Sequence, residues 1–423
     1  MNKHAYNLSE IPGFNELLNP DVVGNSNVLK LNKIECKTNN SSYRVIRYDK
    51  NLLCVDLIPS YGLCRSVILN SANNVVGFAP PKAIHTDVFI NKYPENEHDG
   101  EIEAEEFVEG TMINVFFDST IGVTGSWEIS TRNTVGATSS FFKTPHSKTF
   151  RQMFMEAAAE CKLDINQLDK DLCYSFVLQH PENRIVVPFS KPNLYLVAVY
   201  KILNNSDNSV VVQSYDVFEY EYYFHETIRS SVKFPSSYVC LDYSELIEKY
   251  GSMNTNYDIV GAVIYNNLTG ERTKIRNPVY EQVRNLRGNQ PKLQYQYLCL
   301  RHEGRVKDFL TYYPENKNEF SKFRGQVHLF TDTLYSNYVA CYIKKEKPLI
   351  QFSEQYRTHM FNIHQIYMNE FREKKQFITN TVVQKYVNEL HPSLLMYCLN
   401  YNMRKKMIDK IKLDNENTYT YFT

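Results

Sequence analysis

The spacing of apolar residues changes near residue 278 of this 423-residue chain. Before about residue 275 the apolar segments are short, rich in β-branched and aromatic residues, and separated by polar turns, as in the strands of an antiparallel sheet. Beyond Pro278 the apolar residues recur with the period of an amphipathic helix. The sequence therefore predicts an α+β fold, with a mostly β domain over residues 1–278 and an all-helical domain over residues 279–423.

The N-terminal part contains several segments with strand patterns and one with a helix pattern. The predicted strands cover residues 113–117, 184–189, 194–202, 210–217 and 259–265. An Asn-rich cluster at 204–208 predicts a turn between two of them. The alanine run at 157–159, together with Met153 and Phe154, predicts a helix over about residues 148–162.

The C-terminal part carries three apolar faces with helical spacing. Their members are Val327, Phe330, Leu334, Tyr338, Cys341 and Tyr342; Met360, Ile363, His364, Tyr367 and Phe371; and Val382, Val383, Tyr386, Val387 and Leu390. The third face ends before His391 and Pro392, where proline disfavours continuation of a helix. These faces predict helices that bury one side each.

Charge and cysteine usage exclude some classes of protein. The 47 basic and 47 acidic residues balance, so a nucleic-acid site would have to be a local patch and not a property of the whole surface. The nine cysteines form no C-x-x-C pair, which favours reduced thiols over a disulfide framework or a metal site. No run of 18 apolar residues occurs and the N-terminus lacks an apolar segment, so we expect neither membrane insertion nor secretion.

Residues 105–111 read Glu-Glu-Phe-Val-Glu-Gly-Thr. They follow the outline Lys-x-(Asp/Glu)-Gly-(Ser/Thr), the nucleophile motif of covalent nucleotidyltransferases, but Phe107 stands where the lysine belongs. A desolvated lysine beside other cations loses its proton near neutral pH and can attack the α-phosphate of ATP. A phenyl ring cannot make this attack.

Further segments follow the order of the other motifs of such enzymes. They are Arg65-Ser66-Val67-Ile68, Phe78-Ala79-Pro80-Pro81-Lys82, Trp127-Glu128-Ile129-Ser130-Thr131-Arg132, the stretch 176–186, Val260-Gly261-Ala262-Val263 and Lys274-Ile275-Arg276. In order and spacing, residues 40–280 resemble the T-even phage RNA ligase 1 family of the covalent nucleotidyltransferase superfamily, as encoded by large DNA viruses.

The resemblance implies an antiparallel, ATP-grasp-like ligase domain that uses ATP and Mg²⁺ when active. It places the family's lysine and two glutamates on Phe107, Val177 and Val260, so no catalytic or metal-binding residue is expected there. It also implies a set of nucleotide-binding residues, with Glu109 at the position that contacts the ribose in relatives. The set is Arg65, Lys82, Glu109, Gly110, Arg132, Lys274 and Arg276.

The pattern of losses favours a pseudoenzyme. The three positions that carry the lysine and the two glutamates in the family, Phe107, Val177 and Val260, are all apolar here. This removes the free-energy cost of burying carboxylates that lack a partner. The cations that are expected to face a phosphate remain. We therefore expect an RNA-ligase-like protein that no longer forms a covalent adenylate and binds nucleotides or RNA ends, either single-stranded or tRNA-like. The viral resemblance suggests the host cytoplasm or a viral factory.

Two other functions remain open from the sequence. One is an active ATP-dependent RNA ligase in RNA repair, in which Lys82 or another amine replaces the missing nucleophile. The other is a structural or virion protein that retains only the fold. In the helical part, Arg284, Arg287, Lys292 and Arg301 alternate with Tyr295 and Tyr297, which fits either a single-stranded RNA groove or a solvated helical face.

Overall fold

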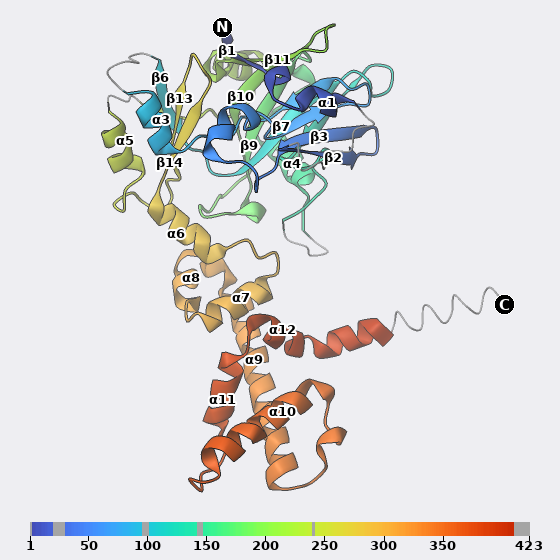
Figure 1. Ribbon diagram of the computed structural model, residues 1–423, viewed down its shortest axis with the longest axis vertical. Helices are drawn as coiled ribbons and strands as arrows, with labels where there is room; N and C mark the ends of the chain where they lie inside the picture. The colour runs from blue at the N-terminus through green and yellow to red at the C-terminus, as the bar shows by residue number, and fades with distance from the viewer. Residues whose placement is uncertain (1, 20–29, 95–100, 142–146, 239–241, 410–423) are drawn as a thin grey trace, which may run out of the picture. The chain divides into compact units, whose positions relative to one another are not determined.

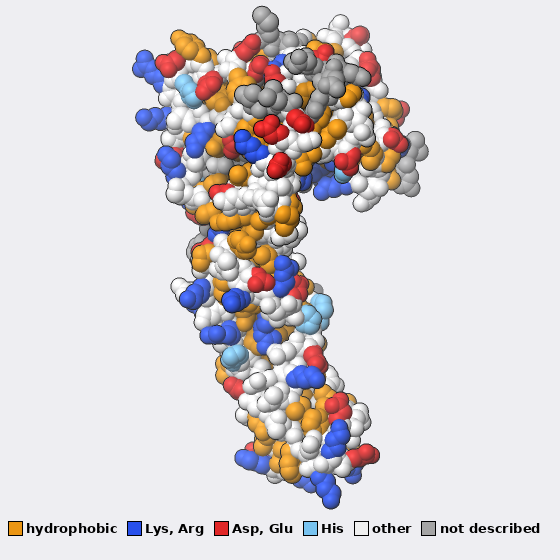
Figure 2. Space-filling view, turned by 90° about the vertical axis from the view of Figure 1, so that its left-hand side faces the viewer, with side chains coloured by type: hydrophobic (Ala, Val, Ile, Leu, Met, Phe, Trp, Pro, Cys, Tyr) orange, Lys and Arg blue, Asp and Glu red, His pale blue; other side chains and the backbone are white. Residues whose placement is uncertain are grey.

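The computed structural model describes residues 2–19, 30–94, 101–141, 147–238 and 242–409 (Figure 1). The chain forms two compact units that divide between Arg284 and Asn285, where the sequence placed the division at 278/279. Both positions lie in or beside α6, Pro278–Arg287, the helix on which the strand pattern ends. Acidic and basic side chains are interspersed on the face shown in Figure 2, as the balanced composition implies.

Unit 1 is built around a six-stranded antiparallel sheet. Its strands, in spatial order, are β1 (Asn2–Asn7), β11 (Val210–Tyr215), β10 (Asn193–Asn204), β9 (Leu172–Gln179), β7 (Thr111–Asp118) and β8 (Ser126–Ser130). The helix α4, Phe150–Glu160, lies against β9 and β10 through its buried face. Every β9 side chain is buried, because one side of the strand meets α4 and the other meets a second sheet.

Two four-stranded antiparallel sheets complete unit 1. One has the order β2 (Leu31–Lys37), β3 (Ser42–Tyr48), β4 (Val67–Leu69) and β5 (Val75–Phe78), and it shares a core with the large sheet. The other has the order β12 (Ser237–Tyr238), β6 (Ile102–Glu106), β13 (Gly261–Asn266) and β14 (Arg272–Arg276). The helices α3, Thr86–Lys92, and α5, Tyr243–Tyr250, cover one face of this last sheet.

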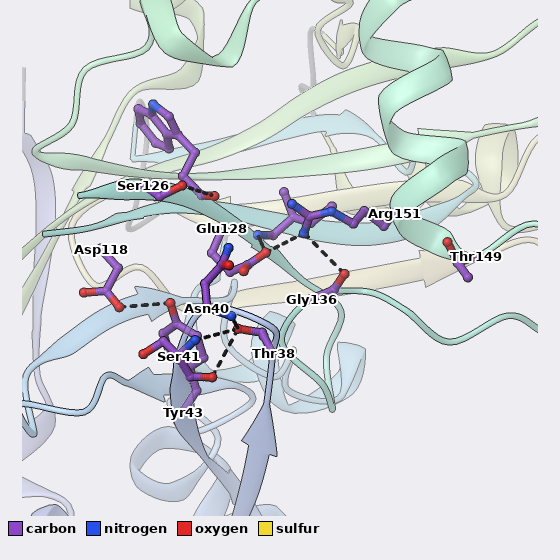
Figure 3. Close-up of polar contacts among 12 residues, drawn as sticks. Thr38, Asn40, Ser41, Tyr43, Asp118, Ser126, Glu128, Gly136, Thr149 and Arg151 are labelled. Atoms are coloured by element: carbon purple, nitrogen blue, oxygen red, sulfur yellow. Dashed lines mark hydrogen bonds and ion pairs between the residues drawn. The ribbon is translucent and has the colours of Figure 1, made fainter. Parts of the chain in front are cut away.

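Buried polar contacts tie these layers together (Figure 3). The Tyr43 hydroxyl on β3 donates to the Asp118 carboxylate on β7 at 2.9 Å. Arg151 of α4 pairs with the buried carboxylate of Glu128 on β8. Because a buried carboxylate without a partner is costly, these pairs fix how the strands and α4 meet.

Most of the predicted elements of unit 1 are present. The strands predicted at 113–117, 194–202, 210–217 and 259–265 correspond to β7, β10, β11 and β13, and the predicted helix corresponds to α4. The strand predicted at 184–189 is wrong, because the short helix η5, Pro181–Asn183, leads there into a loop. The backbone N–H groups of Val186 and Val187 donate to the Glu109 carboxylate, so no neighbouring strand pairs with them.

Unit 2 is helical, as the sequence predicts. Its helices after α6 include α7 (Leu293–His302), α8 (Val306–Tyr312), α9 (Lys317–Tyr338), α10 (Glu354–Ile366), α11 (Asn380–Glu389) and α12 (Pro392–Leu399). The predicted break at His391 and Pro392 separates α11 from α12. Val327, Phe330 and Leu334 are buried on α9. Among the described residues, no helix combines the length and apolar character needed to cross a bilayer.

Candidate anion-binding cleft

A cleft with a volume of about 260 Å³ opens in unit 1 between the β6–β7 connection, β9 and the sheet edge at β14. The apolar positions Phe107, Val177 and Val260, which lie far apart in the sequence, all line it. Five residues of the predicted nucleotide-binding set line it as well. They are Arg65, Glu109, Gly110, Lys274 and Arg276.

The other two predicted cations lie outside this lining. Lys82 is exposed, and its backbone N–H donates to the Gly62 carbonyl at 2.9 Å. Arg132 is half-buried, with its guanidinium 5.0 Å from the centre of the Tyr48 ring. Although the Lys82 side chain is exposed, its partial removal from water, followed by the charges of Arg65, Arg276 and other arginines, lowers its pKa. Both cations therefore add to the positive potential near the cleft without lining it.

The antiparallel register of the small sheet explains how the cleft side chains meet. Val263 on β13 is opposite Glu105 on β6 and opposite Lys274 on β14. Two residues along, Gly261 is opposite Arg276 and accepts a hydrogen bond from the Phe107 N–H. Side chains two residues apart in a strand share a face, so both rows face the cleft.

Phe107 packs directly on the cations of β14. The Lys274 Nζ lies 3.9 Å from the centre of the Phe107 ring, and the Arg276 Cζ lies 5.4 Å from it. Each contact of this kind contributes about 0.5–2 kcal/mol, depending on how far the cation is desolvated. Phe107 therefore covers two of the cations that were predicted to bind a nucleotide.

Burial and neighbouring arginines perturb the titration of these cations. Burial, then the charges of Arg272, Arg65 and Arg276, lower the pKa of Lys274 well below its ordinary value. Burial and the charges of Arg272 and Arg132 lower the pKa of Arg65 to about 10. The crowded positive charges raise the free energy of the empty cleft, and a bound anion would relieve that repulsion.

Glu109, in the connection between β6 and β7, holds the 183–187 loop. The Glu109 carboxylate accepts hydrogen bonds from the N–H groups of Val186, at 2.8 Å, and Val187, at 3.1 Å. Its backbone carbonyl accepts from the Gln179 side chain at 3.0 Å. Burial raises the pKa of Glu109, and these hydrogen bonds act in the opposite direction. This carboxylate thus already supports the backbone, and its predicted contact with a ribose stays a prediction.

Gly110 occupies a position that other residues would strain. Its φ is +150°, and a Cβ there would lie 2.5 Å from the Leu178 carbonyl oxygen and 2.6 Å from a Val177 methyl carbon. We expect Gly110→Ala to lower the free energy of unfolding by about 2–4 kcal/mol, from backbone strain and overpacking together. Denaturant unfolding followed by circular dichroism measures this change.

Gly122→Ala is the matched control for that variant. Gly122 also has a positive φ, +61°, but a Cβ there meets no atom within 4 Å. It should cost about 1 kcal/mol, from conformation alone. Equal stabilities of the two variants would contradict the close approach of Gly110 to β9.

The sequence reasoning missed Glu105 and Arg272 as cleft residues. Arg272 is buried and donates twice to the Pro81 carbonyl, at 2.6 and 3.1 Å, which attaches the 78–82 segment to β14. Alternation along the strand could have revealed it, because Arg272 shares a face with Lys274 and Arg276. Glu105 is half-buried, and burial raises its pKa to about 7. Glu105 lies in the cleft because β6 pairs with β13, and this pairing could not be predicted from the sequence.

The sequence is similar to that of an RNA ligase. Over 296 residues it is 23% identical to the RNA ligase of Rhodothermus phage RM378, and the match covers 61% of this chain and 64% of the relative. Over 316 residues it is 22% identical to the Immediate-early protein ICP-46 homolog of Invertebrate iridescent virus 6, a match that covers 69% of this chain and 65% of that protein. The chain thus matches less than two thirds of the length of either relative.

No family model matches the sequence. Among solved structures, an archaeal ATP-dependent RNA ligase is 14% identical with a TM-score of 0.38, and the comparison covers 70% of this chain and 72% of that one. The two viral sequence matches support an RNA-ligase-like protein.

Proposed function

We propose that this chain is an RNA-ligase-like protein of the T-even phage RNA ligase 1 type. In this proposal its nucleotidyltransferase-like unit binds the phosphate of a nucleotide or an RNA end and forms no lysyl adenylate. The observation that carries the proposal is the Phe107 ring at the nucleophile position, packed 3.9 Å from the Lys274 ammonium. The ring cannot attack phosphorus, whereas the cations around it can still hold an anion.

The cleft fits phosphate oxygens better than it fits a divalent metal. Val177 and Val260, at the positions of the family's glutamates, are both buried and apolar. Three carboxyl groups of the described residues line the cleft. Glu109 already accepts backbone hydrogen bonds, Glu106 accepts from the N–H and hydroxyl of Ser236, and burial raises the pKa of Glu105. Mg²⁺ prefers ionised oxygen ligands in near-octahedral geometry, which this set does not supply. ATP is therefore proposed only as a ligand whose phosphates meet the cations.

RNA is the proposed partner, and single-stranded or tRNA-like ends remain the proposed form. The helical face suggested by the sequence supports this only in part, because Tyr297 is buried against the Phe320 ring and cannot stack on a base. Tyr295 and Arg301 stay partly accessible on α7. The viral relatives favour a place of action in the host cytoplasm or a viral factory.

Covalent labelling tests the loss of adenylation. We expect no protein-bound label after the full chain is incubated with α-labelled ATP and Mg²⁺ and then denatured, because the nucleophile position carries no amine. An active RNA ligase treated in parallel shows that the assay detects the adduct. A labelled band would overturn the proposal, and its loss in Lys82→Ala or Lys274→Ala would identify the displaced amine of an active ligase. Absence of phosphate or RNA binding would instead favour a protein that keeps only the fold.

A further inference from the structure

Two cations in the cleft lack an acidic partner. Arg276 pairs with Glu281 at 2.9 Å, whereas Arg65 and Lys274 form no ion pair with a carboxylate within the part of the chain that the structure describes. Among the described residues, the Arg65 guanidinium donates only to the Pro80 carbonyl, at 3.4 Å. Charged side chains that are partly buried without a counter-ion are costly, so this arrangement is suited to an anion from outside.

The groups that face Lys274 come from every neighbouring element. They are Arg272 and Arg276 on β14, Arg65 before β4, Glu105 on β6, Phe107 after β6, and Tyr265 on β13. The guanidinium groups stay charged at neutral pH. Glu105 is the carboxyl whose charge acts on Lys274, and burial raises its pKa to about 7, so it offsets the arginine charges only in part. Glu106 and Glu109 also line the cleft, but they accept hydrogen bonds from Ser236 and from the backbone of Val186 and Val187. Without a ligand, this surrounding charge opposes the protonated form of Lys274.

We propose that the cleft binds a dianionic phosphomonoester against Lys274 and Arg65, and that Lys274 takes up a proton from solvent as the phosphate binds. The inference rests on the proposed function, since it assigns the ligand to the same cleft. A phosphomonoester carries nearly two negative charges above its second pKa of about 6, whereas a phosphodiester carries one. The doubly charged group offsets more of the arginine repulsion, so the cleft selects a terminal phosphate over an internal one.

The sign of the pH dependence follows from Lys274. Its pKa is lowered in the free protein, and a phosphate beside the ammonium raises it again. Between these two pKa values binding consumes a proton, so affinity falls as the pH rises, by up to about tenfold per pH unit for one proton. Work between about pH 8 and 9.5 keeps the phosphate and Glu105 ionised. The amines of Lys274 and Lys82, which both have a lowered pKa, are then the groups that can take up the proton, and the Lys274→Arg variant separates them.

Calorimetric titration of the full chain measures the proton directly. Titrations at about pH 8.5 in two buffers of different ionisation enthalpy give the number of protons taken up per ligand. The probes are inorganic phosphate, AMP, and one oligoribonucleotide in 5′-phosphorylated and 5′-hydroxyl forms. We expect net proton uptake for AMP and binding at least about tenfold weaker for the 5′-hydroxyl oligonucleotide. Comparison of AMP with inorganic phosphate shows whether the nucleoside contributes.

Three variants separate the effect of the positive charge at position 274 from the effect of proton uptake there. Lys274→Arg should bind AMP within a few-fold of the unaltered chain but without proton uptake, because a guanidinium stays charged. Lys274→Met should weaken binding at least about tenfold. Lys50→Met, which removes an exposed lysine outside the cleft lining, should change neither quantity.

The outcomes distinguish the two proposals. Binding without proton uptake, or uptake that persists in Lys274→Arg, overturns this inference and leaves the proposed function standing. Equal affinity for the two oligonucleotides overturns the selection of terminal phosphates. If no phosphate ligand binds, the proposed function and the inference both fall.

Discussion

Replacing Phe107 by lysine, the residue of the ligase motif, is expected to lower the free energy of unfolding by about 2–4 kcal/mol. The variant loses the ring that contacts Lys274 and Arg276 and adds a cation beside them. Arg65 and Arg272 are also close, so the new ammonium has several like charges near it. Positions 177 and 260 carry valine, so no carboxylate there can offset them. Chemical denaturation of the full chain, followed by fluorescence and circular dichroism, measures the loss.

Two further variants show which part of the change matters. Phe107→Leu removes the ring without adding charge and should cost only about 1 kcal/mol. Combining Phe107→Lys with Val177→Glu and Val260→Glu should recover part of the lost stability, because the two carboxylates would face the added cation in the same cleft. If Phe107→Lys alone proves as stable as the unaltered protein, the contact of the ring with the β14 cations has no energetic role.

Reversing the charge of Lys274 and Arg276 together, as Lys274→Glu with Arg276→Glu, is expected to weaken RNA binding by at least about 100-fold at low salt. The two side chains project from one strand into the cleft, so the double variant turns two attractions for phosphate into repulsions. The carboxylate of Lys274→Glu would lie near Arg65 and Arg272, whereas Arg276→Glu loses the ion pair with Glu281. An unchanged circular dichroism spectrum must therefore accompany the loss of binding.

Salt dependence identifies the kind of contact that is lost. Each phosphate contact adds roughly 0.7–0.9 to the slope of log affinity against log salt concentration, so the double variant should show a slope smaller by about 1–2. Lys50→Glu serves as the control for a change of charge outside the cleft lining. An unchanged affinity and slope, with an intact circular dichroism spectrum, would move the site away from this cleft and favour a protein that retains only the fold.

The secondary structure was predictable wherever a local pattern coincided with burial. β10 and β11 alternate around a polar turn at 204–208, and α9 presents a continuous apolar face, so short-range spacing alone predicts them. The prediction of a strand at 184–189 was wrong because its apolar residues lie in a loop. The partner that satisfies the loop backbone, Glu109, lies 77 residues away from Val186 in the sequence.

The candidate site was predictable only at the positions that align with residues of the RNA ligase motifs. Phe107, Val177 and Val260 line one cleft with Arg65, Lys274 and Arg276. The sequence could not separate these cations from Lys82 and Arg132, because accessibility to a cleft depends on packing. Glu105 lies in the cleft because it pairs across the sheet with Val263. This pairing depends on the strand register, which residues near Glu105 in the sequence do not determine.

The sequence by itself determined the division into β and helical parts and the absence of an amine at position 107, because periodicity and residue chemistry are local properties. Only the tertiary structure decided that the Phe107 ring lies on Lys274, that Glu109 holds a loop, and that Arg65 and Lys274 share a cleft in which neither forms an ion pair with a described carboxylate. Those facts depend on which strands pair and how far each charge is removed from water. Such long-range relations set the electrostatics of the cleft, and the electrostatics set what it can bind.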